Sequence, residues 1–161
     1  MPASKTRCYM KSLLMVLGRA ALSFVFLGAV AGKVLDWDSN HQYMLDGLCS
    51  WYTATASIPQ LQELFGMVIP NSHFLLILAM TLEGLGGLLV LFGVKPRFGA
   101  FLLLLFIIPT TILMHAFWMV SPSEKELQMI MFLKNISIMG GLLILLASGG
   151  KEKAPKTSKN D

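Results

Sequence analysis

The sequence has few charged residues. Only 14% of its 161 residues are Asp, Glu, Lys or Arg, whereas 55% are hydrophobic. A soluble domain typically has about 25% charged residues, so this shortage excludes an ordinary soluble globular protein. The high hydrophobic share excludes an intrinsically disordered chain, which needs low hydrophobicity and high charge. The length indicates one domain. These bounds leave an integral membrane protein as the class that fits.

Cysteine is scarce as well. The two cysteines, Cys8 and Cys49, are too few for a disulfide framework. We expect them on opposite sides of the membrane, where they cannot pair. The sequence also lacks Cys-x-x-Cys or other metal-ligand spacing, and it has no recognisable motif for flavin, haem or an iron–sulfur cluster. We therefore expect no metal site, and no cofactor that a sequence motif encodes.

Four long apolar runs dominate what is present. Each approaches the ~20 residues that a helix needs to cross a bilayer, and none has the regular polar face of a soluble amphipathic helix. They predict an all-α fold, an integral membrane four-helix bundle. The expected helices cover about residues 13–31, 74–92, 98–120 and 129–147.

Three regions follow from these runs. Residues 1–11 form a basic N-terminal segment, 12–148 the membrane domain, and 149–161 a Lys-rich tail that we expect to be disordered. The one long connection, residues 32–73, is the expected extracytoplasmic loop. Within it Leu61, Leu64, Phe65 and Val68 recur at helical spacing, which predicts a short interfacial helix. An irregular loop with apolar anchors is the alternative.

The basic residues predict the orientation. Two of them, Lys33 and Lys125, fall on one side of the expected spans. Nine fall on the other: Lys5, Arg7, Lys11, Lys95, Arg97, Lys151, Lys153, Lys156 and Lys159. By the positive-inside rule both termini are cytoplasmic, and the net charge of +4 reports orientation, not a nucleic-acid surface. Cleavage after Ala31 as a secretory signal is the less favoured alternative, because the apolar run is long and contains Arg19.

One ionisable residue lies inside each expected span: Arg19, Glu83, His115 and Lys134. A charge within a span costs at least ~2.5–3.5 kcal/mol on insertion scales, so such residues usually face the bundle interior and find partners. We expect Arg19 and Lys134 to flank Glu83, with His115 above them. With His115 neutral, this cluster carries a net charge of +1, which favours an anion, a quinone oxygen or a further carboxylate as a partner. The alternative is a purely structural cluster.

Glycines recur beside these residues. Small residues let membrane helices approach closely. We therefore expect helix contacts at these positions: Gly28, Gly32, Gly84, Gly86, Gly87, Gly140 and Gly141.

Four motifs resemble the DoxX-like family of small four-helix membrane proteins. They are Gly18-Arg19-Ala20-Ala21-Leu22-Ser23 leading to Gly32-Lys33, Glu83-Gly84-Leu85-Gly86-Gly87 followed by Gly93 and Arg97, His115-Ala116-Phe117-Trp118, and Phe132-Leu133-Lys134-Asn135 leading to Gly140-Gly141. Their order and spacing carry the resemblance, which covers about residues 12–147. The 32–73 loop is longer than expected for many members.

The resemblance implies a quinone-linked oxidoreductase subunit of a bacterial inner (plasma) membrane, with a more distant similarity to the Surfeit-locus cargo receptor. On this hypothesis His115 and Glu83 are catalytic, and Arg19, Lys134, Asn135 and Trp118 bind the quinone or a small anion. Electrons would come through the quinone or a partner redox subunit. The bilayer is the expected environment, a homo-oligomer is open, and no nucleic acid is expected. The alternatives are a non-catalytic scaffold or chaperone subunit and a small-solute transporter.

Overall fold

The computed structural model describes residues 3–148, and all regular structure in that range is helical. The elements are α1 (Ala3–Leu35), α2 (Trp37–Ala54), α3 (Pro59–Val68), the 3-10 turn η1 (Ile69–Asn71), α4 (Ser72–Phe92), α5 (Pro96–Met114) and α6 (Pro122–Ser148). The expected Lys-rich tail, residues 149–161, lies outside the described residues, as do the first two residues of the basic segment.

The described residues contain four helical stretches that are long and apolar enough to cross a membrane: Tyr9–Leu35, Pro59–Phe92, Pro96–Met114 and Pro122–Ser148. This confirms the all-α fold and the four spans. The expected span at 74–92 agrees with α4 to within its first turn. The first and last helices begin earlier than expected, at Ala3 and Pro122. Pro122 suits the start of α6. Proline lacks a backbone N–H, and the N–H groups of the first turn have no partner within the helix.

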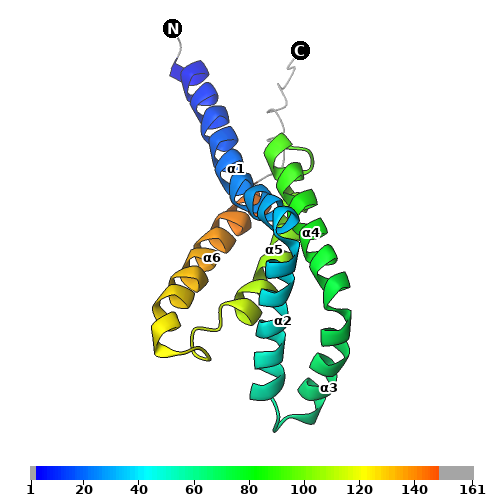
Figure 1. The fold of residues 1–161 in the computed structure, drawn as a ribbon. Coiled ribbons are helices and arrows are strands. Elements are labelled where there is room, and N and C mark those ends of the chain that lie inside the picture. Colours follow the sequence, from blue (N-terminus) through cyan, green and yellow to red (C-terminus); the bar gives the residue numbers. More distant parts are fainter. Residues whose placement is uncertain (1–2, 149–161) are drawn as a thin grey trace.

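The spans pack in the order α1, α4, α5, α6, with α4 between α1 and α5. Their common core is a cluster of buried apolar side chains: Phe26, Val90, Ala100, Leu103, Leu104, Phe106, Ile107 and Leu142. Figure 1 shows that the C-terminal end of α6 lies beside α1, whereas the N-terminal end of α6 stands away from α2.

The molecule has two distinct ends (Figure 1). We call the end with the turn between α4 and α5 the turn end. There Arg97 donates a hydrogen bond from Nη2 to the carbonyl oxygen of Ala147, 3.0 Å away, which fastens the start of α5 to the end of α6. We call the opposite end, which holds α2 and α3, the hairpin end.

The 32–73 connection is a helical hairpin. The short helix expected there is confirmed as α3, but the segment before it forms the 18-residue helix α2 instead of a loop. Met44 and Leu48 of α2 pack against Phe65 of α3 and Leu76 of α4. The exposed face of α2 is polar, which lowers its mean hydropathy. The helical structure of α2 depends on its narrow buried face, where the apolar residues Met44 and Leu48 are four positions apart.

The helix expected over 98–120 ends early, at Met114. The last carbonyls of a helix lack partners within the helix, and α2 supplies them here. Tyr43 donates its hydroxyl to the carbonyl of Met114, and Trp51 donates its indole N–H to that of Leu113, each at 3.0 Å. Residues 115–121 consequently form a connecting segment, and His115 lies at the end of α5, not inside a membrane helix.

Candidate functional site

An ion pair joins α1 to α4 in the middle of the bundle. Lys33 Nζ lies 2.6 Å from Glu83 Oε2, and the two side chains are 19% and 3% exposed. Glu83 stands midway along α4, about 15 Å from Gly93 at the turn end, at ~1.5 Å per residue. A buried carboxylate at this depth needs a close cation to offset the loss of water. Lys33 is that cation.

Glycines on α4 bring the neighbouring helices close to Glu83. A Cβ on Gly86 would lie 2.8 Å from Leu103 Cγ, and one on Gly87 would lie 3.1 Å from Leu27 Cδ2. Gly86 therefore lets α5 approach α4 closely, and at Gly87 a side chain would have to displace the end of Leu27 on α1. The predicted contacts hold at Gly86, Gly87 and Gly141, and at Gly84, where a Cβ would lie 3.8 Å from Val30 Cγ2. They are wrong at three further glycines, where a Cβ would meet nothing within 4 Å: Gly28, Gly32 and Gly140.

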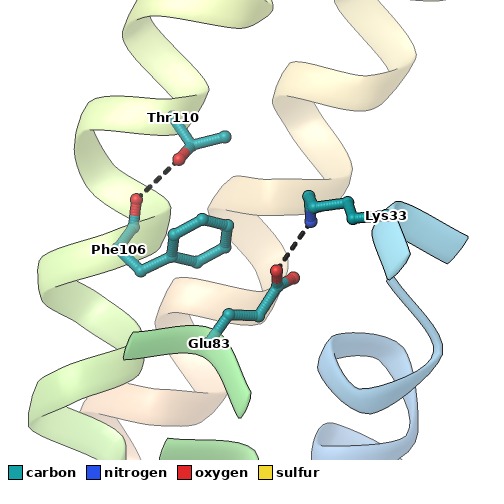
Figure 2. A network of polar contacts seen from close by, with 4 residues as sticks. All are labelled: Lys33, Glu83, Phe106 and Thr110. Carbon is teal, nitrogen blue, oxygen red and sulfur yellow. Dashed lines mark hydrogen bonds and ion pairs between the residues drawn. The ribbon is translucent and has the colours of Figure 1, made fainter. Parts of the chain in front are cut away.

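An aromatic ring forms one wall of the ion pair. Lys33 Nζ stands 5.5 Å from the centre of the Phe106 ring, a distance at which cation and ring attract. Phe26 packs edge-on against the same ring, with centroids 6.4 Å apart. Figure 2 shows the ammonium and the carboxylate pointing towards one another beside Phe106. One turn further along α5, Thr110 donates its hydroxyl to the Phe106 carbonyl.

The expected cluster around Glu83 is wrong in its cations. Lys33, which we had placed in the loop, occupies the position expected for Arg19 and Lys134, because α1 continues to Leu35. One cation faces one carboxylate, so the pair is neutral and the expected net charge of +1 does not arise.

Arg19 lies at the turn end. A Cβ on Gly93 would overlap the Arg19 guanidinium, so this cation covers the C-terminus of α4, where the helix dipole favours positive charge. Among the described residues, Arg19 Nε and Ser23 Oγ one turn later are buried without a hydrogen-bond partner. Arg19 therefore sits level with the turn between α4 and α5, nearer the end of the bundle than expected.

Lys134 lies exposed on α6, away from Glu83. Its ammonium donates to the sulfur of Met131, 3.3 Å away. The next residue, Asn135, is buried and donates from Nδ2 to Thr111 Oγ1 at 3.0 Å, which links α6 to α5. Thr111 in turn donates to the carbonyl of Ile107. These two neighbours thus face opposite environments.

His115 and Trp118 lie together near the hairpin end, in the segment between α5 and α6. His115 Nδ1 is 2.8 Å from Gln128 Oε1, a hydrogen bond that links the end of α5 to α6. Trp118 packs edge-on against Phe117 and Phe132, at centroid distances of 5.0 and 5.8 Å. His115 is about 13 Å along α5 from Phe106, at ~1.5 Å per residue, and forms a separate group.

A cavity of about 270 Å³ opens beside this group, between α2, the end of α5 and the start of α6. Asp46 and Glu124 supply its carboxylates, and Tyr43 and Trp51 line it with their rings. The hydrogen donors of both rings are already engaged by the carbonyls at the end of α5.

Sequence reasoning missed Lys33 as a site residue. The apolar run ends at Ala31, and a span counted from that run leaves Lys33 outside. The available signal was the Gly32-Lys33 pair that closes the first family motif. A lysine there is close enough to the span for its long side chain to extend back along the helix.

Comparisons with known proteins agree with this architecture. The family model described as DoxX matches residues 14–116, which include Lys33, Glu83 and Phe106. The chain is 29% identical over 134 residues to "Inner membrane protein YqjF" of Escherichia coli (strain K12), covering 83% of this chain and 82% of that protein. No solved structure matches the chain. The family match covers more than half of the chain and includes three of its four membrane-crossing helices, so this integral membrane protein belongs to the DoxX family.

Proposed function

We propose that this protein is a subunit of a membrane redox system and binds the head group of a quinone at the Lys33–Glu83 pair. The observation that carries the proposal is a hydrogen-bond donor and a proton-accepting group held 2.6 Å apart at mid-depth beside an aromatic ring. Lys33 has three N–H groups, of which one points to Glu83. The remaining donors suit a carbonyl oxygen.

The neutrality of the pair favours a quinone over a small anion. An anion needs a surplus of positive charge in a medium of low dielectric constant, and Glu83 already balances Lys33. A quinone carbonyl is uncharged and needs only a donor. The buried Phe106 ring keeps the surroundings of the pair apolar, and the Lys33 side chain, 19% exposed, is the part of the pair that a head group can reach.

Each residue then has a defined role. Lys33 donates to a quinone oxygen, and Glu83 orients Lys33 and exchanges a proton with it. A bound quinone supplies two-electron redox chemistry, and the electrons come from a partner subunit. His115 would carry protons towards the hairpin end, and Trp118 would line that route. Arg19 and Asn135 would hold α4 and α6 in place around the site.

We place the protein in the bacterial inner membrane with both termini on the cytoplasmic side. The name of the Escherichia coli relative supports the membrane, and the distribution of basic residues supports the orientation. The hairpin end then faces outwards, and the turn end, with Lys95 and Arg97, faces the cytoplasm.

Quinone content tests the proposal. The protein is purified with its native lipids, and quinone is extracted and measured per mole of protein. We expect Lys33→Met and Glu83→Gln to contain at least ten-fold less quinone per mole of protein than the unaltered chain. Lys33→Arg should retain part of the quinone. Lys125→Met is the matched control, because Lys125 is exposed at the start of α6. Equal quinone content in Lys33→Met and Lys125→Met, in well-folded preparations, would contradict the proposal.

A further inference from the structure

Lys134 is a charged residue on the exposed side of a membrane-crossing helix. It lies in the span Pro122–Ser148, about 20 Å from Ala147 at ~1.5 Å per residue. The apolar part of α6 begins at Met129, so Lys134 lies about 8 Å inside the nearer end at ~1.5 Å per residue, and its ammonium turns towards that end to reach Met131. Within residues 3–148 the polar contact of its ammonium is with the sulfur of Met131, a weak acceptor. A lysine in this position costs several kcal/mol unless an acidic group meets it.

The residues around Lys134 form a surface suited to another helix. We define the outer face of α6 as the exposed residues on the side that bears Lys134: Ile130, Leu133, Lys134, Ser137, Gly140 and Ile144. The Ser137 hydroxyl is turned back to the carbonyl of Leu133, so it presents no free donor. A Cβ on Gly140 would meet nothing within 4 Å. This open glycine lies two turns from Lys134 and lets a second backbone come close.

We propose that the outer face of α6 docks a transmembrane helix of another protein, one that carries an Asp or Glu at the depth of Lys134. The charge of Lys134 sets this chemistry, because a carboxylate neutralises the ammonium where water is absent. The buried face of α6 is already occupied by α5, through Asn135 and Leu142. The partner therefore adds to the bundle on the side away from α5.

A second copy of this chain does not meet the requirement. Two outer faces packed together would place Lys134 against Lys134. The mid-depth carboxylate of this chain, Glu83, is 2% exposed and already bonded to Lys33. The partner is consequently a different protein, and this inference stands independently of quinone binding.

Designed helices of known chemistry test the docking. The full chain, labelled with a fluorophore, is reconstituted in phosphatidylcholine vesicles at pH 8 with labelled Leu/Ala transmembrane peptides that carry Glu, Gln or Leu at their centre. Energy transfer reports association. We expect the Glu peptide to associate at least ten-fold more strongly than the Leu peptide. We expect Lys134→Met to remove that difference, and Lys134→Arg and the control Lys125→Met to keep it.

A change of shape without a change of charge supplies the second arm. Gly140→Leu fills the open position and should weaken association of the Glu peptide at least three-fold while leaving thermal unfolding unchanged. Equal binding of the Glu and Leu peptides to the unaltered chain would overturn the proposal and leave Lys134 extending towards the membrane surface alone. An unaffected Gly140→Leu variant would overturn the outer face as the docking surface.

Discussion

The ammonium of Lys33 stands between two groups of different character, with the Glu83 carboxylate 2.6 Å away and the Phe106 ring centre 5.5 Å away. The carboxylate balances its charge, and the ring shields it from lipid. This arrangement ties the end of α1 to the centre of α4 and to α5. The pair is therefore a structural link among three helices.

Breaking the pair on one side should destabilise the protein more than removing it entirely. Glu83→Gln or Lys33→Met alone should cost roughly 3 kcal/mol, because each leaves an uncompensated charge in the bundle. The double variant should recover at least half of that loss. Unfolding in mixed micelles measures these free energies. A double variant as unstable as the sum of the two single variants would show that the charges act independently.

Gly86 should tolerate no side chain. Gly86→Ala would force Leu103 to move and press on the Gly99 carbonyl oxygen, which stands 3.1 Å from the added Cβ. We expect a loss of about 1–3 kcal/mol in the free energy of unfolding, as for overpacked cores. Gly28→Ala is the control, because its Cβ meets open space. Equal stability of the two variants would contradict the close approach of α4 and α5.

Gly93 and Arg19 should be energetically coupled. Gly93 has φ +68°, where a residue with a side chain costs about 1–2 kcal/mol. Gly93→Ala also displaces the Arg19 guanidinium from the end of α4. The loss from Gly93→Ala should therefore be smaller in an Arg19→Met background than in the unaltered chain. Unfolding of the four variants of this cycle measures the coupling, and simple additivity would refute the contact.

Asn135 should act through Thr111. A hydrogen bond between membrane helices contributes about 0.6 kcal/mol on average, up to about 1.7. The cycle of Asn135→Leu and Thr111→Val should give a coupling energy in that range. If Asn135 instead serves a ligand alone, Thr111→Val will have no effect in either background, while quinone content will fall in Asn135→Leu.

The end of α5 should open when its caps from α2 are removed. Tyr43→Phe deletes the donor to the Met114 carbonyl and keeps the ring. We expect a loss of about 1 kcal/mol, visible as several-fold faster hydrogen exchange in the segment that follows Met114. Tyr52→Phe is the matched control on the same helix, because within residues 3–148 the Tyr52 hydroxyl makes no hydrogen bond. Unchanged exchange in Tyr43→Phe would mean that α5 ends there for another reason.

The sequence predicted what depends on local composition. A run of about 20 apolar residues has few alternatives to a spanning helix, so the four spans were recognisable, and α4 was placed to within a turn. The inward position of Glu83 followed from the cost of a charge in lipid, and Glu83 is 2% exposed.

What the sequence did not show depends on how helices are arranged. Lys33 meets Glu83 because α1 continues past its apolar run, which no hydropathy boundary reveals. Arg19 lies at the turn end because α1 extends beyond the turn between α4 and α5. The helical state of α2 depends on contacts with Phe65 and Leu76, residues that follow it in the chain.

The attachment of α6 has a mechanical consequence. Its 27 residues measure about 40 Å along the axis, of which the apolar part from Met129 onwards matches a hydrocarbon core of ~30 Å. The bonds from Arg97 to Ala147, from Asn135 to Thr111 and between His115 and Gln128 fasten it to α5 and the residue that follows α5 at three levels. The wall that α6 gives to the cavity, with Glu124 and Gln128, therefore belongs to a helix that is held along its whole length.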